Sequence, residues 1–98
     1  MKTIWFIDDE EDLLSLYRDI FEEEESLDSI DKKYITHHDE CKAVSGDIVI
    51  HDLYGVGKVD RIDGVQYRSC SGSFVDKSDF LKPMDFEKMS LAIRKLHG

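Results

Sequence analysis

Five charged or polar residues stand directly behind short apolar segments of this chain, where a strand could hold them rigidly at its tip. The five are Asp8, Asp9, Asp52, Ser71 and Lys82. TIWFI at 3–7 precedes the first pair, and DIVIH at 47–51 precedes Asp52. If these segments are strands of one parallel sheet, their carboxyl ends meet at one edge, where ligands bind in open α/β sheets. We therefore expect three carboxylates, a hydroxyl and an ammonium group to converge there.

Three carboxylates in so small a space repel one another strongly. Two unit charges about 4 Å apart repel by roughly 4 kcal/mol at an effective dielectric of about 20. A divalent cation relieves this repulsion, and an all-oxygen ligand set suits Mg²⁺ better than zinc. Asp52 could then attack phosphorus and form an acyl phosphate, while Mg²⁺, Lys82 and Ser71 neutralise the equatorial oxygens. A set of solvated strand ends without chemistry is the alternative interpretation.

The spacing of apolar residues predicts alternating strands and helices. Strands are expected at residues 3–7, 33–36, 48–51, 65–70 and 80–81, and helices at 11–24, 38–44 and from Phe86 onward. Asp85 is expected to cap the last helix. Residues 53–64 show no period and are expected to form a loop. Alternation of this kind is typical of a parallel sheet with helical crossovers, which is an α/β fold.

Length and charge limit the class of protein. The chain has 98 residues, 41% of them hydrophobic, which suits a single domain spanning residues 1–98. Its net charge of −9 argues against a general binder of nucleic acid or of anionic membranes, whose surfaces are basic. No segment has the pattern of a signal peptide or a membrane span. Cys41 and Cys70 form no C-x-x-C pair, so we expect reduced thiols in a cytoplasmic domain.

Four short motifs together resemble the receiver domain of two-component response regulators. They are FIDDE at 6–10, DIVIHD at 47–52, SG at 71–72 and KP at 82–83. The resemblance covers essentially the whole chain, and the spacing from Asp8 to Asp52 (52 − 8 = 44) is that of the family. Each motif is common alone, whereas all four in this order at strand ends are specific. The resemblance implies a flavodoxin-like, five-stranded parallel sheet of order 2-1-3-4-5.

The resemblance also implies which residues accept the phosphoryl group and hold the metal ion. Asp52 is similar to the phosphoacceptor of the family. Asp8 and Asp9 are similar to the acidic pair that holds Mg²⁺, together with Asp52. The backbone carbonyl of Tyr54 corresponds to a further ligand of that ion.

Residues later in the chain match the parts of the family that respond to phosphorylation. Ser71 matches the Ser/Thr switch residue, and Lys82 matches the lysine that precedes a cis proline, here Pro83. The family's aromatic switch residue stands three places before that lysine. Asp79 occupies this place in the present chain, and Phe80 is the nearest aromatic candidate.

The second half of the chain departs from the family in length. Asp52 and Ser71 are 19 positions apart (71 − 52), and Ser71 and Lys82 are 11 apart (82 − 71), each short by about one helix. A parallel crossover normally needs about a dozen residues or more. We therefore predict a minimised fold, with the third and fourth helices absent or reduced to loops. One face of the sheet should then lie partly bare, and the polar series on its wet side is expected to be Gln66, Arg68 and Cys70.

These observations predict a stand-alone receiver domain that works as a signalling switch. A histidine kinase or phosphotransfer protein would phosphorylate Asp52, the domain itself would catalyse this transfer and the later hydrolysis, and its partner binding or association would change. A homodimer is expected through the bare face of the sheet. The alternative is a degenerate receiver that serves as an interaction or dimerisation module without phosphorylation.

Overall fold

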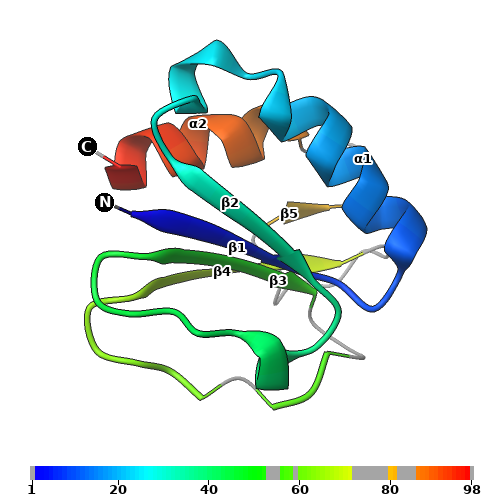
Figure 1. The fold of residues 1–98 in the computed structure, drawn as a ribbon, viewed down its shortest axis with the longest axis vertical. Helices are drawn as coiled ribbons and strands as arrows, with labels where there is room; N and C mark the ends of the chain where they lie inside the picture. The colour runs from blue at the N-terminus through cyan, green and yellow to red at the C-terminus, as the bar shows by residue number, and fades with distance from the viewer. Residues whose placement is uncertain (1, 53–55, 59, 72–79, 82–85, 98) are drawn as a thin grey trace.

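The computed structural model of the chain describes residues 2–52, 56–58, 60–71, 80–81 and 86–97. Within them the chain alternates between strands and helices, as Figure 1 shows. The elements are β1 (Thr3–Ile7), α1 (Glu11–Glu22), β2 (Asp31–Ile35), β3 (Ile48–Asp52), β4 (Gln66–Ser71), β5 (Phe80–Leu81) and α2 (Phe86–His97), with two single 3₁₀ turns, η1 (Glu25–Leu27) and η2 (His38–Glu40). Asp85, the predicted cap of the last helix, lies outside the described residues.

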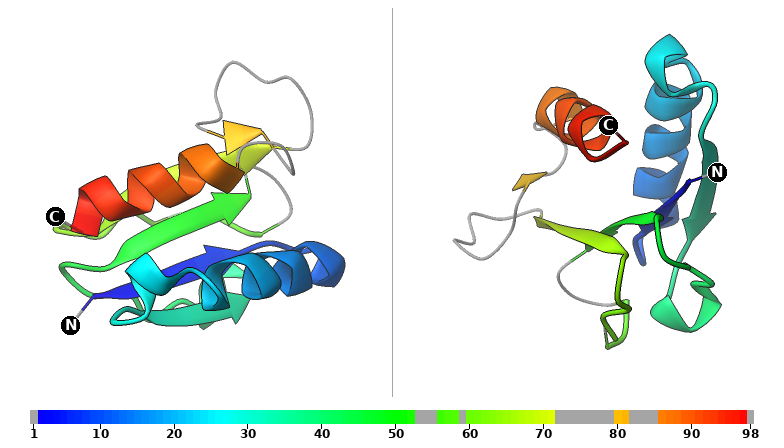
Figure 2. Two further views of the ribbon diagram at one scale, coloured as in Figure 1. Left: turned by 90° about the horizontal axis from the view of Figure 1, so that it is seen from above. Right: turned by 90° about the vertical axis from the view of Figure 1, so that its left-hand side faces the viewer.

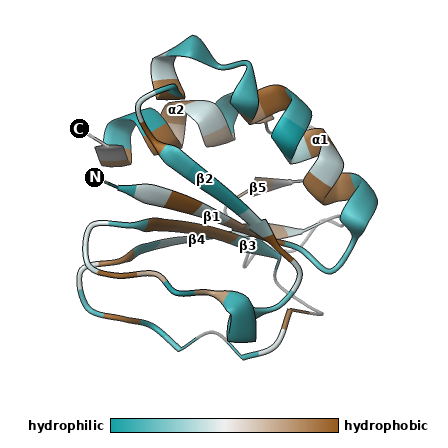
Figure 3. Cartoon of the chain, viewed as in Figure 1, coloured by the Kyte–Doolittle hydropathy of each residue, from teal (hydrophilic) through white to brown (hydrophobic). Residues whose placement is uncertain are grey.

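The strands form a parallel sheet in the order β2-β1-β3-β4, which confirms the predicted α/β class. The two residues of β5 pair with the end of β4, Phe80 opposite Cys70 and Leu81 opposite Ser71. The central strands β1 and β3 carry the apolar residues, whereas the edge strand β2 is mostly hydrophilic (Figure 3). Strands covered on both faces need apolar residues at every position, which explains why the runs in β1 and β3 are continuous.

Both helices lie on the same side of the sheet (Figure 2). Their apolar faces pack against alternate residues of the strands and form the larger core. An aromatic stack fills its centre, with the ring of Phe6 on β1 lying 5.2 Å from that of Tyr17 and 4.9 Å from that of Phe21, both on α1. The buried members of this core are Ile4, Phe6, Leu14, Tyr17, Phe21, Leu27, Ile30, Ile48, Ile50, Cys70, Phe80, Met89 and Ile93.

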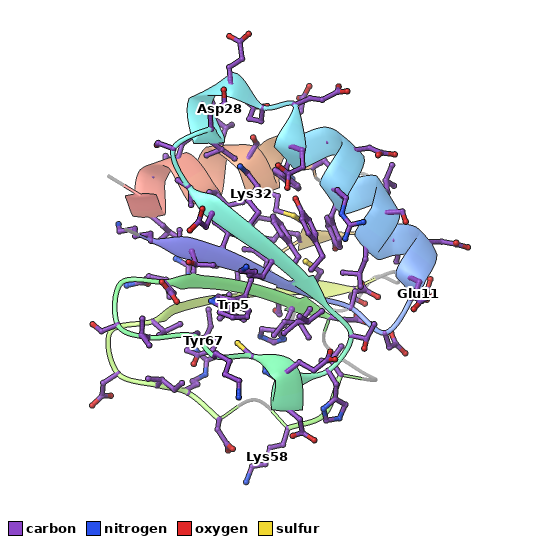
Figure 4. All side chains as sticks on the ribbon, viewed as in Figure 1. Trp5, Glu11, Asp28, Lys32, Lys58 and Tyr67 are labelled. Carbon is purple, nitrogen blue, oxygen red and sulfur yellow. The ribbon has the colours of Figure 1, made fainter. Side chains whose placement is uncertain are left out.

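Among the described residues, irregular segments and no α-helix cover the opposite face of the sheet. The segment between β2 and β3 and the one before β4 pack on this face, where Figure 4 places Trp5 and Tyr67. Both side chains are 8% exposed, and Val49 of β3 is fully buried between them. The buried members of this second core are Trp5, Ile7, Ala43, Val49, Val56, Val65 and Tyr67. We call this side of the sheet the loop-covered face.

Asp47 joins the segment before β3 to β1 on the loop-covered face, at the end of the sheet where β1 and β3 begin. Its buried carboxylate accepts hydrogen bonds from the Trp5 indole and from the backbone N–H groups of Thr3 and Val44, each at 3.0 Å. Three donors on one carboxylate satisfy its lone pairs and offset the cost of burying its charge. The residue thereby fixes the segment before β3 against β1.

Two sequence predictions are corrected by this arrangement. The predicted helix over 38–44 is only the three-residue turn η2: Cys41 directly after it is extended, and the N–H group of Val44 donates to Asp47 instead of to a helical carbonyl. The polar series Gln66, Arg68 and Cys70 was expected on a face of the sheet that is uncovered and exposed to solvent. Instead Cys70 is fully buried in the helix-side core and Arg68 is half-buried, while the other face is covered. Only Gln66 of the three is exposed.

The predicted loss of helices is tested only in part. The described residues between β3 and β4, 56–58 and 60–65, form no helix, as the short spacing predicted. The segment that would hold the fourth helix, 72–79, lies outside the described residues. Among the helices that are described, none has the length and apolar character needed to cross a membrane.

Candidate functional site

The structure brings three of the predicted site residues together at the carboxyl edge of the sheet. One carboxylate oxygen each from Asp8, Asp9 and Asp52 lies within 4.8 Å of the others. The sheet dictates this proximity, because β1 and β3 are parallel neighbours and their register pairs Ile7 with His51. Asp8 and Asp52, the next residue of each strand, therefore lie side by side. We call these three residues the acidic cluster.

The members of the acidic cluster differ in exposure and in support. Asp8 is fully buried, Asp52 is half-buried and Asp9 is exposed. The Asp8 carboxylate accepts a hydrogen bond of 2.9 Å from the N–H group of Glu10, which turns the chain from β1 into α1. Its own N–H group donates to the carbonyl of Ile35 on β2 at 3.0 Å. One hydrogen bond therefore holds the backbone of Asp8 against β2, and another holds its carboxylate at the start of α1.

Electrostatics make the acidic cluster a site that favours a cation. Two charged carboxylates about 4.8 Å apart repel by roughly 3 kcal/mol at an effective dielectric of about 20. The donor set is oxygen only, which suits a hard divalent cation such as Mg²⁺ or Ca²⁺. An open hollow of about 600 Å³ adjoins the cluster and is lined by Asp9, the first residues of α1 and Thr36. A small ligand can therefore reach the cluster from solvent.

A row of side chains on neighbouring strands continues the acidic cluster along the helix side of the sheet. Asp52 pairs with Cys70 in the β3–β4 register, and Cys70 pairs with Phe80 in the β4–β5 register. Register partners point to the same face, so Asp8, Asp52, Cys70 and Phe80 form one line. Phe80, the predicted aromatic switch residue, is 6% exposed and packs in the helix-side core.

Tyr17 of α1 lies beneath this row, a position that its apolar spacing in the sequence did not distinguish from ordinary core packing. Burial raises the pKa of its hydroxyl well above the usual range, and the neighbouring Cys70, Asp8 and Asp52 raise it further. The hydroxyl therefore stays protonated.

The remaining predicted site residues are placed less completely. Ser71 is buried and ends β4, one position beyond Cys70, so strand alternation directs it to the loop-covered face. Tyr54, Lys82 and Pro83 lie outside the described residues. The structure therefore places Ser71 at the same sheet edge as the acidic cluster but on the other face of the sheet, and the roles of all four residues stay predictions.

Two histidines on the loop-covered face form a second group of titratable side chains. The rings of His38 and His51 meet edge to face with 5.5 Å between their centroids, and His51 Nδ1 lies 2.9 Å from the carbonyl oxygen of Asp52. Burial lowers the pKa of His38, and the neighbouring His51 and His37 lower it further. Among the described residues no hydrogen-bond partner faces the buried Nε2 of His38. The sequence carries no signal for this pairing, because it joins η2 to β3 across the sheet.

Comparison with known proteins adds no relative. No protein-family model matches the chain, and neither a curated protein nor a solved structure matches it significantly. The assignment of a function therefore rests on the residues of the chain and on the geometry of the acidic cluster.

Proposed function

We propose that the chain is a stand-alone receiver domain whose phosphoacceptor is Asp52. The observation that carries the proposal is the acidic cluster, in which oxygens of Asp8, Asp9 and Asp52 lie within 4.8 Å at the carboxyl edge of a parallel sheet. The strand order β2-β1-β3-β4 supports it, since extension by a full fifth strand at β5 gives the flavodoxin-like order 2-1-3-4-5. Sites in such sheets lie at this edge.

Asp8, Asp9 and Asp52 would hold Mg²⁺ in this proposal, with the carbonyl of Tyr54 as a further ligand. The bound ion supplies positive charge to the oxygens of an incoming phosphoryl group. Asp8 suits the role of a fixed ligand, because it is buried and held by the N–H group of Glu10. Asp9 is exposed and adjoins the open hollow through which solvent reaches the cluster.

The proposed reaction is a transfer between two nucleophiles. A carboxylate oxygen of Asp52 forms a bond to phosphorus while the phosphorus–nitrogen bond of a phosphohistidine breaks, and the imidazole leaves with that electron pair. The donor is a histidine kinase or a phosphotransfer protein. Lys82 stabilises the equatorial oxygens together with Ser71, which must turn from the loop-covered face toward Asp52 to reach them, and water later cleaves the acyl phosphate to release phosphate.

The proposed output is a change in partner binding. Phosphorylation would alter the conformations around Ser71 and Phe80, which lie at the ends of adjoining strands. In this proposal a change at the acidic cluster reaches Phe80 along the row in which Cys70 lies between it and Asp52.

Phosphoryl uptake from acetyl phosphate tests the proposal without a cognate kinase. The wild-type chain is incubated with Mg²⁺ and acetyl phosphate, and its intact mass is followed over time. We expect one phosphoryl group in the wild type and in Asp19→Asn, a matched change on the exposed side of α1. We expect none in Asp52→Asn or in the presence of a chelator. Wild-type protein that takes up no phosphoryl group and binds no beryllofluoride contradicts the proposal and favours the phosphorylation-independent module.

A further inference from the structure

The imidazole of His51 lies directly behind the proposed phosphoacceptor, on the loop-covered face of the sheet. His51 precedes Asp52 in β3, so strand alternation turns the two side chains to opposite faces. In the register of the sheet its neighbours are Ile7 of β1 and Ser69 of β4, and all three side chains are buried. Two residues earlier in β3, the same face carries the apolar side chain of Val49. A polar ring therefore stands where the strand otherwise places an apolar residue.

The imidazole of His51 reaches to the backbone of the residue that follows it. Its Nδ1 lies 2.9 Å from the carbonyl oxygen of Asp52. A carbonyl oxygen can only accept, so Nδ1 carries the proton and donates. This carbonyl belongs to the peptide through which the chain leaves the proposed nucleophile. The hydrogen bond therefore fixes the orientation of that peptide at the tip of β3.

The turn η2 packs against the imidazole of His51. The rings of His38 and His51 meet edge to face, with 5.5 Å between their centroids. The N–H group of His38 donates to the carbonyl of Val56 at 2.8 Å. Val56 follows Asp52 further along the chain and is buried in the second core. One short turn is therefore linked to two points of the chain, to Asp52 through His51 and to Val56 directly.

We propose that His51 is a positioning residue of the phosphoacceptor site, which fixes the peptide of Asp52 and is itself kept in place by His38. The inference rests on the proposed function, and it adds to that site a residue that does not touch the incoming phosphoryl group. A turn of the Asp52 peptide moves the carboxylate as well, because both are attached to the same Cα. A shift of about 1 Å in a reacting group can slow a reaction by about 100-fold.

His51→Asn and His51→Leu test the inference as a matched pair. The amide nitrogen of asparagine is bonded to Cγ, as Nδ1 of histidine is, so it offers a donor at the same distance from the backbone. Leucine fills similar space and offers no donor. Leucine also suits the buried surroundings of this position, so we expect the free energy of unfolding of His51→Leu to equal or exceed that of the wild type.

The rate of phosphorylation of each protein is measured over a range of acetyl phosphate concentrations with saturating Mg²⁺. The pH is about 8, above the ordinary pKa of histidine, so that protonation does not distinguish the variants. We expect the maximal rate of His51→Leu to fall by about tenfold or more, with the half-saturating donor concentration unchanged. We expect His51→Asn to retain most of the wild-type rate.

A double-mutant cycle tests the part that His38 plays. His38→Ala removes the ring that packs against His51, and we expect a lower maximal rate. In the His51→Leu background the same change should have no further effect, because the hydrogen bond to Asp52 is already lost. Losses that add in the double variant would show that His38 acts by another route.

The outcomes separate the inference from the function on which it rests. Wild-type protein that takes up no phosphoryl group overturns both. Active wild-type protein together with an equally fast His51→Leu overturns the positioning role alone. An equal loss of rate in His51→Asn and His51→Leu also overturns it, since the donor is then not what matters. So does a slow His51→Leu that has lost stability in urea denaturation, since the loss of rate then belongs to the fold.

Discussion

Asp8, Asp9 and Asp52 show how one sheet edge gives three identical side chains different environments. Asp8 is buried and held by a backbone N–H group, Asp52 is half-buried at the end of β3, and Asp9 faces the open hollow. In the proposed function, Asp8 is therefore a fixed metal ligand, Asp52 the nucleophile and Asp9 an exposed metal ligand. Their mutual repulsion is retained in the fold, as is typical of sites where function is favoured over stability.

Asp52→Asn is expected to stabilise the metal-free protein. The substitution removes one of three charges that lie within 4.8 Å of one another, and the amide fills the same space. We expect the free energy of unfolding to rise by about 1 kcal/mol, after allowance for solvent screening of the half-buried group. Urea denaturation with a chelator present measures this. An unchanged or lower stability would show that the three carboxylates do not strain the fold.

Asp47→Ala is expected to destabilise the protein strongly. It leaves the Trp5 indole and the N–H groups of Thr3 and Val44 without their acceptor. We expect a loss of about 3 kcal/mol, since buried donors are costly to leave unpaired. Asp63→Ala, an exposed change near β4, is the control. Urea denaturation followed by Trp5 fluorescence measures both, and equal stability of the two variants would contradict the structural role of Asp47.

Regular elements could be predicted from the sequence, whereas the irregular cover of the sheet could not. The apolar run of β1 and the helical spacing in α1 and α2 are local patterns, so their bounds were predicted closely. The segment after η2 is held by Asp47, which binds Val44 and Thr3 of β1, and no local pattern shows this. The prediction of a solvent-exposed face from the polar residues of β4 was wrong for a similar reason. Cys70 is buried because Tyr17 and the row from Asp52 to Phe80 enclose it.

The acidic cluster itself could be predicted, because its members directly follow strands that pair in a simple order. The position of Tyr17 in the same core as Cys70 could not, because it depends on how α1 packs on the sheet. The pairing of His38 with His51 could not be predicted from the sequence for the same reason. It depends on the packing of η2 on β3 rather than on any spacing in the chain.

Because His38 is packed in η2 against His51, we expect the free energy of unfolding to depend on pH through His38. Its pKa in the folded chain is lowered from 6.5, by burial first and then by His51 and His37, while Asp60 and Asp39 oppose the shift. The unfolded chain therefore binds the proton more tightly, and the free energy of unfolding falls as the pH drops through about 6.5. Above that range both states are neutral at His38 and the effect vanishes.

Comparison with His38→Gln isolates this contribution from the other groups that titrate nearby. Stability is measured by urea denaturation at about pH 8 and about pH 5.5, on either side of the ordinary histidine pKa. We expect the wild type to lose more stability than the variant between the two conditions. Equal losses in the two proteins would contradict a lowered pKa at His38.

At the scale of the whole molecule, the described helices cover one side of the sheet and described irregular segments cover the other. The bare face that motivated the predicted homodimer is covered in the described residues, where Val49 and Tyr67 are buried. Self-association therefore stays a proposal, and the residues available for it are on the covering segments. Val44 and Ile62 are the large hydrophobic side chains exposed there, at 62% and 45%.

Light scattering with size-exclusion chromatography tests self-association directly. A homodimer through the loop-covered face predicts twice the 11.4 kDa mass of the chain, and a monomer for the double variant Val44→Asp, Ile62→Asp. The net charge of −9 opposes close approach of two copies, so the dimer should strengthen as salt is added. A monomer at all salt concentrations would contradict the proposed dimer.

Identification of the phosphorylated residue tests the central claim most directly. After incubation with acetyl phosphate and Mg²⁺, borohydride reduction converts an aspartyl phosphate into a stable homoserine that tandem mass spectrometry locates. We expect the mark at Asp52, at no other residue, and only when Mg²⁺ is present. A mark at another carboxylate, a mark that forms equally without Mg²⁺, or no mark would contradict it.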